Sequence, residues 1–209
     1  MLVALSVAMV AILAVGGSLA YFSDQKEANN YFSVGNVKIE LTEPGWESSG
    51  KLDAPGVYPG EPLKKDPTVK NVGANPCFVR IRIEGLDTLI PATIPTGKTA
   101  DDYMIRLRTG TSNAGIGVLG TDWVDGGDGY YYYKKVLVDD AVNGFSLTTT
   151  PLCNYIIMPT AIENGYEWDW KTVKVTAQAV QAQLAKPSFA AVKTMTVPEI
   201  ISWFGTCGL

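Results

Sequence analysis

The sequence predicts an all-β protein, a jelly-roll-like antiparallel β-sandwich with few short helices. Several segments alternate apolar and polar residues with a period of two, the pattern of a strand with one face in a core and the other in water. The chain is also rich in turn formers, with 21 glycines and 12 prolines among 209 residues. Many short strands separated by turns are typical of an antiparallel sandwich.

The strand pattern is clearest in four segments, and it recurs at a hairpin. The alternating segments are residues 37–41, 79–84, 105–108 and 173–179. The hairpin turn is 125–129 (DGGDG), which separates Trp123-Val124 from the run 130–138. Because no repeat or low-complexity linker divides residues 37–209, we expect one domain there.

One segment has the features of a helix. Residues Val197–Phe204 follow Thr196, which can cap a helix N-terminus, and Pro198 suits the first turn. This segment is the best helix candidate in the chain, and we expect it to pack over one end of the sandwich.

Residues 1–20 predict an export signal. No charged residue precedes Asp24, and the apolar run 2–15 leads into Gly16–Ala20 (GGSLA). An apolar segment followed by small residues is the form of a secretory signal peptide, here cleaved between Ala20 and Tyr21. The alternative is a retained membrane anchor. Cleavage would give a secreted protein with no stable membrane anchor.

The composition excludes several functions. The chain has no histidine, so it cannot build a His-zinc site or a His-dependent catalytic triad. Its formal net charge is −4, and it has no basic run that would suit a nucleic acid. We therefore expect no enzyme activity, no cofactor and no nucleic-acid partner.

Three groups of residues are candidates for binding or cross-linking. Asp122, Asp125 and Asp128 are weak candidates for a Ca²⁺ site, and a solvated turn is the favoured alternative. Trp123 with the run 130–133 (YYYY) could form a sugar platform, although packing between strands explains these aromatics more simply. Secretion permits a disulfide between Cys77 and Cys153 if they lie on neighbouring strands, which would leave Cys207 free or cross-linking.

A series of motifs resembles the TasA/camelysin family of exported proteins from Gram-positive bacteria. In chain order these motifs are Ala20–Asp24 (AYFSD), Asn30–Pro44 (NYFSVGNVKIELTEP), Pro59–Glu61, Lys65–Pro67, Val69–Gly73, Phe78–Ile81, Asp128–Leu137, Thr149–Leu152 and Ala177–Gln181. Their order is more specific than any one of them, and they extend from about residue 15 to about residue 182.

The resemblance implies a secreted jelly roll whose signal is cut by a SipW-type signal peptidase. It also implies head-to-tail homopolymers in biofilm-matrix fibres, in which the N-terminal segment 21–36 completes a sheet of the neighbouring subunit. The apolar residues of this donor segment are Tyr21, Phe22, Tyr31, Phe32 and Val34. For residues 37–41 a first strand of the same subunit is favoured, whereas 21–32 fits a donor strand and a disordered tail equally well.

Three functions follow for testing. The leading hypothesis is a structural protein of extracellular fibres, on the cell surface or in the matrix. The alternative is a monomeric cell-surface adhesin or carbohydrate-binding module. The third, a camelysin-like metallopeptidase, is disfavoured because the chain has no His-Glu-x-x-His motif.

Overall fold

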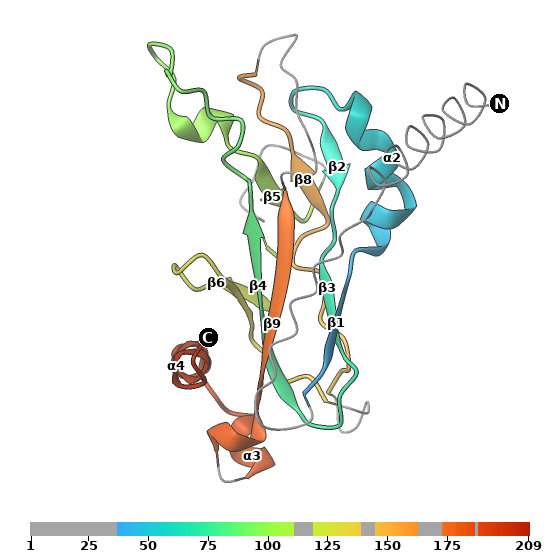
Figure 1. Cartoon of the computed structure of the whole chain (residues 1–209), viewed down its shortest axis with the longest axis vertical. Helices are drawn as coiled ribbons and strands as arrows, with labels where there is room; N and C mark the ends of the chain where they lie inside the picture. The colour runs from blue at the N-terminus through green and yellow to red at the C-terminus, as the bar shows by residue number, and fades with distance from the viewer. Residues whose placement is uncertain (1–36, 111–118, 139–144, 163–172, 187) are drawn as a thin grey trace, which may run out of the picture.

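The computed structural model describes residues 37–110, 119–138, 145–162, 173–186 and 188–209 (Figure 1). The expected signal peptide and donor segment, residues 1–36, therefore lie outside the described residues. In the described part the chain forms antiparallel sheets with few short helices, which confirms the all-β fold class.

The strands form three sheets within the described residues. The four-stranded sheet has the order β6 (Trp123–Asp125), β7 (Tyr131–Tyr133), β4 (Cys77–Glu84) and β9 (Lys174–Gln181). The three-stranded sheet has the order β2 (Pro62–Lys64), β8 (Tyr155–Ile157) and β5 (Arg106–Arg108), and β1 (Ile39–Thr42) pairs with β3 (Thr68–Asn71). Figure 1 shows the long strands β4 and β9 side by side.

The predicted strands are confirmed, with changed ends. The alternating segments become β1, β4, β5 and β9, and the hairpin pairs β6 with β7 so that Trp123 lies opposite Tyr133. The main core gathers apolar side chains from all three sheets, including Ile39, Leu63 and Val79. The strands β2 and β8 have three residues each, too few to show a periodic pattern.

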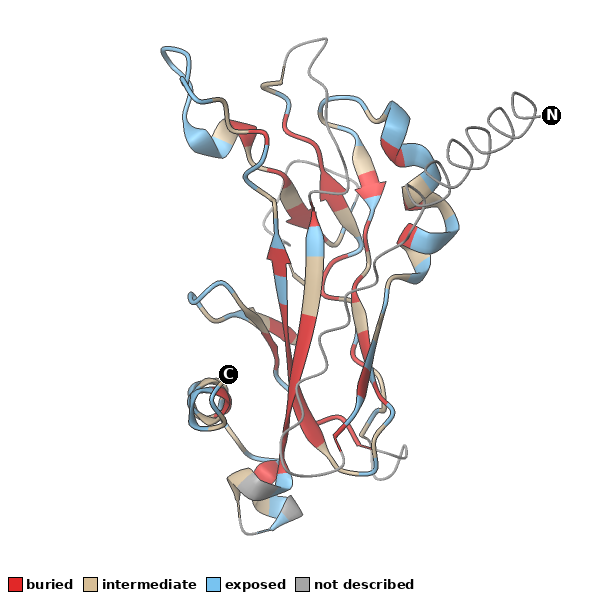
Figure 2. Ribbon diagram, viewed as in Figure 1, coloured by how far each residue is buried: buried red, intermediate tan, exposed pale blue. Residues whose placement is uncertain are grey.

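The expectation that one face of every strand meets water is wrong for β4. Its first residues are buried on both faces: Val79 and Ile81 lie in the main core, while Phe78 and Arg80 are 1% and 5% exposed on the other face. A second core covers this outer face, formed with side chains of the C-terminal segment such as Phe204. Figure 2 shows the burial concentrated in the parts of β4 and β9 nearest the C-terminal helices.

The predicted helix is confirmed as α4 (Val197–Thr206), which follows the short helix α3 (Phe189–Val192). Thr196 is its N-cap, and Glu199 completes a capping box by accepting hydrogen bonds from the Thr196 amide and hydroxyl at 2.8 and 2.9 Å. Glu199 also pairs with Lys186 at 2.9 Å.

Helix α4 should loosen in acid. The Thr196 amide, followed by the Lys186 side chain, lowers the pKa of Glu199 from 4.5 to about 2. A carboxylate with a depressed pKa contributes stability above its unfolded value and loses it as the pH falls through the folded value. Amide hydrogen exchange in α4 should therefore speed up between pH 4.5 and 2, after correction for intrinsic rates. Glu199→Gln should lack this transition; a transition retained in that variant would assign it elsewhere.

A helical segment after β1 was not predicted from the sequence. It consists of a π-helical turn (Trp46–Gly50), α2 (Lys51–Asp53) and a 3₁₀ turn (Ala54–Gly56). Gly50 permits its close approach to β2, because a Cβ atom there would lie 2.4 Å from the Lys64 carbonyl oxygen. Further 3₁₀ turns are Ala100–Tyr103 and Gln183–Ala185.

Candidate functional site

The three aspartates proposed for calcium are each engaged by the protein itself. Asp122 pairs with Lys135 at 2.8 Å, and Asp125 accepts a hydrogen bond from the Gly127 amide at 2.9 Å. Asp128 accepts from the Tyr130 amide at 3.0 Å and from the Tyr132 hydroxyl at 2.7 Å. Among the described residues no three His, Cys, Asp or Glu side chains are grouped to hold a metal ion. The arrangement is that of a hydrogen-bonded turn.

The aromatic run forms no exposed sugar platform. Trp123 is only 4% exposed, its ring lies 5.1 Å from that of Tyr133, and its Nε1 donates to the Thr150 carbonyl. Successive tyrosines alternate as strand geometry requires: Tyr131 and Tyr133 contact the main core, and the two others contact the second core. The platform hypothesis is therefore wrong for Trp123.

The disulfide considered between Cys77 and Cys153 is not formed. All three cysteines are free; Cys77 lies in the four-stranded sheet, whereas Cys153 precedes β8 of the three-stranded sheet. Burial raises the pKa of the Cys77 thiol to about 12, so this thiol stays protonated and unreactive at neutral pH. Cys207 is half-buried at the C-terminal end of α4.

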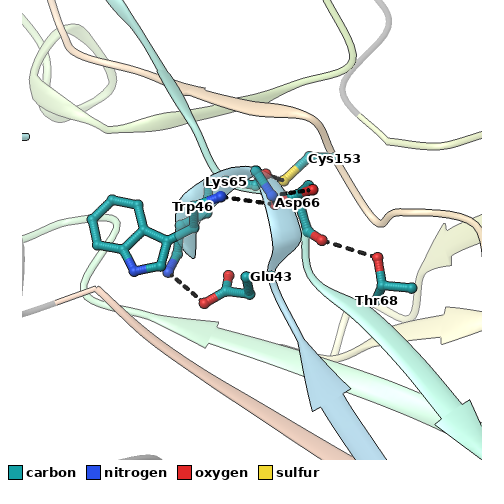
Figure 3. A network of polar contacts seen from close by, with 7 residues as sticks. Glu43, Trp46, Lys65, Asp66, Thr68 and Cys153 are labelled. Carbon is teal, nitrogen blue, oxygen red and sulfur yellow. Dashed lines mark hydrogen bonds and ion pairs between the residues drawn. The ribbon is translucent and has the colours of Figure 1, made fainter. Parts of the chain in front are cut away.

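A buried polar cluster joins the helical segment to the sandwich (Figure 3). Lys65 donates a hydrogen bond to Glu43 Oε2 at 2.9 Å, and the side chains are 5% and 16% exposed. The Lys65 ammonium also lies 4.5 Å from the centroid of the Trp46 ring. Burial raises the pKa of Glu43, with Lys65 opposing the shift. The other Glu43 oxygen, Oε1, is buried without a hydrogen-bond partner among the described residues.

Asp66 fixes the position of this helical segment. Its carboxylate accepts hydrogen bonds from the Gly45 amide at 2.8 Å and the Trp46 amide at 3.1 Å. On the other side, the Cys153 thiol donates to the Lys65 carbonyl at 3.2 Å. Sequence reasoning missed this cluster because 22 residues separate Glu43 from Lys65, and no local pattern shows that the ends of β1 and β2 meet.

A second buried charge lies beneath α4. Arg80 donates to Gln178 Oε1 at 2.7 Å and to the Tyr132 hydroxyl at 3.0 Å. Its guanidinium lies between two aromatic rings, 3.7 Å from the centroid of Tyr130 and 4.7 Å from that of Phe204. These contacts compensate for the burial of the Arg80 guanidinium, which the alternating pattern of residues 79–84 had predicted to face water.

A groove of about 610 Å³ lies beside the second core. Its lining combines lysines with hydroxyl groups, including Lys134, Lys193 and Thr148. Lys193 lies 4.9 Å from the centroid of the Phe145 ring, which also lines the groove. The groove therefore offers cations, hydroxyl groups and an aromatic face.

A model of the family described as camelysin metallo-endopeptidase matches residues 1–78. No curated protein and no solved structure matches the chain. Within the described residues, no helix is long and apolar enough to cross a membrane. The donor set does not fit the metal that the family description implies, because the chain lacks histidine and the described carboxylates and thiols form no group of three. Over residues 1–78 the match bears out the resemblance of the chain to the TasA/camelysin family.

Proposed function

We propose that this chain is a secreted structural protein that polymerises into extracellular fibres. In this proposal the N-terminal segment 21–36 of one subunit adds a strand to the next, and no residue has a catalytic role. The match of residues 1–78 to the camelysin family model supports the class of protein. The observation that carries the assembly mechanism is the long edge strand β9.

Strand β9 offers an acceptor edge. It pairs with β4 in continuous register from Glu84–Lys174 to Cys77–Gln181, and no described strand pairs with its other side. Two hydrogen bonds show which backbone groups near the end of β9 face β4. The Ala182 amide donates toward β4, to the Pro76 carbonyl oxygen at 2.8 Å. The carbonyl of the preceding residue, Gln181, does not bond to β4 but accepts a hydrogen bond from the Trp203 side chain.

Antiparallel pairing makes successive residues alternate in direction. Val175, Ala177 and Ala179 therefore direct their backbone amide and carbonyl groups away from β4. A strand added along them would satisfy these groups, and its alternate apolar side chains would contact the core. Repeated head-to-tail addition gives an open filament unless it closes into a ring.

Electron microscopy of protein that begins at Tyr21 tests this assembly. Filaments should form, and deletion of residues 21–30 should abolish them while leaving a folded monomer. Val175→Pro should also abolish them, because proline removes an outward amide without breaking a bond to β4. Val175→Thr keeps the amide and should polymerise. Filaments that persist in the deletion variant would refute strand donation.

The groove favours a second candidate function, binding of an anionic polysaccharide. Lys134 and Lys193 would contact acidic groups, and Thr148 would contact sugar hydroxyls. A mature protein that folds, binds such a polymer and never forms filaments would support this candidate over the fibre.

A further inference from the structure

We propose that Lys65 and Glu43 become joined by an amide bond inside the folded protein, an intramolecular isopeptide cross-link. The two side chains are the buried ion pair of the cluster in Figure 3. The cross-link would be a covalent modification made by the chain on itself.

The fold holds the reacting groups in contact. Lys65 Nζ lies 2.9 Å from Glu43 Oε2, so the amine is adjacent to the carboxyl carbon that it would attack. Productive attack distances are about 3–3.5 Å, and fixed neighbours can react as if at effective concentrations of about 10⁵ M or more. Burial of both side chains keeps bulk water away and disfavours the reverse hydrolysis.

The surroundings disfavour the charged form of Glu43. A buried ion pair loses the hydration of both ions, and here the Glu43 Oε1 atom has no described partner to compensate. Burial raises the pKa of Glu43 against the opposing effect of Lys65, with smaller contributions from Asp66 and Glu47, and so favours the protonated form of this carboxyl. Transfer of one proton along the Lys65–Glu43 hydrogen bond gives a neutral amine beside a neutral carboxylic acid.

The reaction is a condensation that balances without an oxidant or other reagent. The lone pair of Lys65 Nζ attacks Glu43 Cδ, forming the C–N bond. One carboxyl oxygen then leaves as water, carrying the proton already transferred to it and a second proton from the amine. The products are one amide and one water molecule, and both buried charges disappear.

The cross-link would tie the residue after β1 to the residue after β2. It would close the loop that contains the helical segment, and closing a loop lowers the entropy of the unfolded chain. If the proposed fibre function holds, tension on the N-terminal segment enters the subunit through β1. The amide would pass that load directly to β2, without stretching residues 44–64.

Intact mass spectrometry of the denatured protein tests the bond. The mass should be lower than the sequence requires by one water molecule, and trypsin should release residues 39–51 joined to residues 65–70. A full sequence mass, with these peptides separate, would overturn the proposal. The result is independent of polymerisation, because an unmodified protein could still form fibres and a modified one could stay monomeric.

Matched variants locate the bond. Glu43→Gln should lose one ammonia in place of water, since an amide side chain can undergo the same attack with a different leaving group. Lys65→Arg keeps a cation and should show its full sequence mass. A water loss that persists in Lys65→Arg would assign the modification to other residues and overturn the proposal.

Discussion

Replacing Phe204 with alanine should lower the free energy of unfolding by about 3–5 kcal/mol, as large-to-small changes at buried aromatics do. The Phe204 side chain is fully buried, packs edge-on against Tyr132 at 5.5 Å and covers the guanidinium of Arg80. The variant leaves a cavity in the second core and exposes a buried cation to partial solvation. Chemical denaturation gives the stability change, and hydrogen exchange shows whether α4 leaves the sheet.

Ser202→Ala is the matched control, because Ser202 lies on α4 and is exposed. It should change stability by no more than about 0.5 kcal/mol. Equal effects of the two substitutions would contradict the second core. Loss of protection confined to α4 in Phe204→Ala would show that the sandwich keeps its fold without this helix.

Replacing Lys65 with methionine should cost about 3–5 kcal/mol, the usual result of leaving one member of a buried ion pair without its partner. The variant keeps Glu43 beneath the helical segment and removes both the hydrogen bond and the contact with the Trp46 ring. The variant should be less stable whether the native protein holds the ion pair or the proposed amide, because the substitution removes either link. Chemical denaturation at neutral pH gives the value.

The Lys65→Met deficit should shrink in acid. Burial already raises the pKa of Glu43 above 4.5, and loss of Lys65 raises it further because that cation opposes the shift. A buried carboxyl with a raised pKa destabilises the fold while ionised, so the penalty is full above the folded pKa and disappears below the unfolded value near 4.5. A deficit that is constant with pH would contradict this assignment.

Removal of the exposed pair between Arg106 and Asp101 is the control for the buried one. Their side chains are 37% and 77% exposed at a separation of 2.7 Å. Arg106→Ala should cost no more than about 1 kcal/mol, because water screens such pairs. The comparison separates the effect of burial from the effect of pairing.

Local patterns predicted much of the fold. The alternation in residues 173–179 predicted β9, the DGGDG turn predicted the hairpin, and Thr196 with Pro198 predicted α4. Each is a signal within one segment, set by strand pleat, turn geometry or helix capping. The same local signals failed at the helical segment 46–56, which depends on Asp66, Lys65 and the close approach of Gly50 to β2.

The candidate sites likewise separate what local patterns can predict from what contacts between distant segments create. The sequence suggested the aspartates near the hairpin, a Cys77–Cys153 bond and an aromatic platform, because these residue types are close in the chain or suited to such roles. The structure instead uses them as turn acceptors, free buried thiols and core packing. The Glu43–Lys65 pair was invisible to these patterns, since two distant strand ends create it.

By itself the sequence determined the all-β class, the position of α4 and the family resemblance, because periodicity, capping and motif order are written along the chain. Only the tertiary structure decided which polar residues are buried. Arg80 alternates as a solvent-facing residue, yet α4 covers it; Lys65 occurs in a polar stretch, yet Trp46 and Glu43 enclose it. Burial depends on what packs over a strand, and here that packing comes from segments distant in sequence.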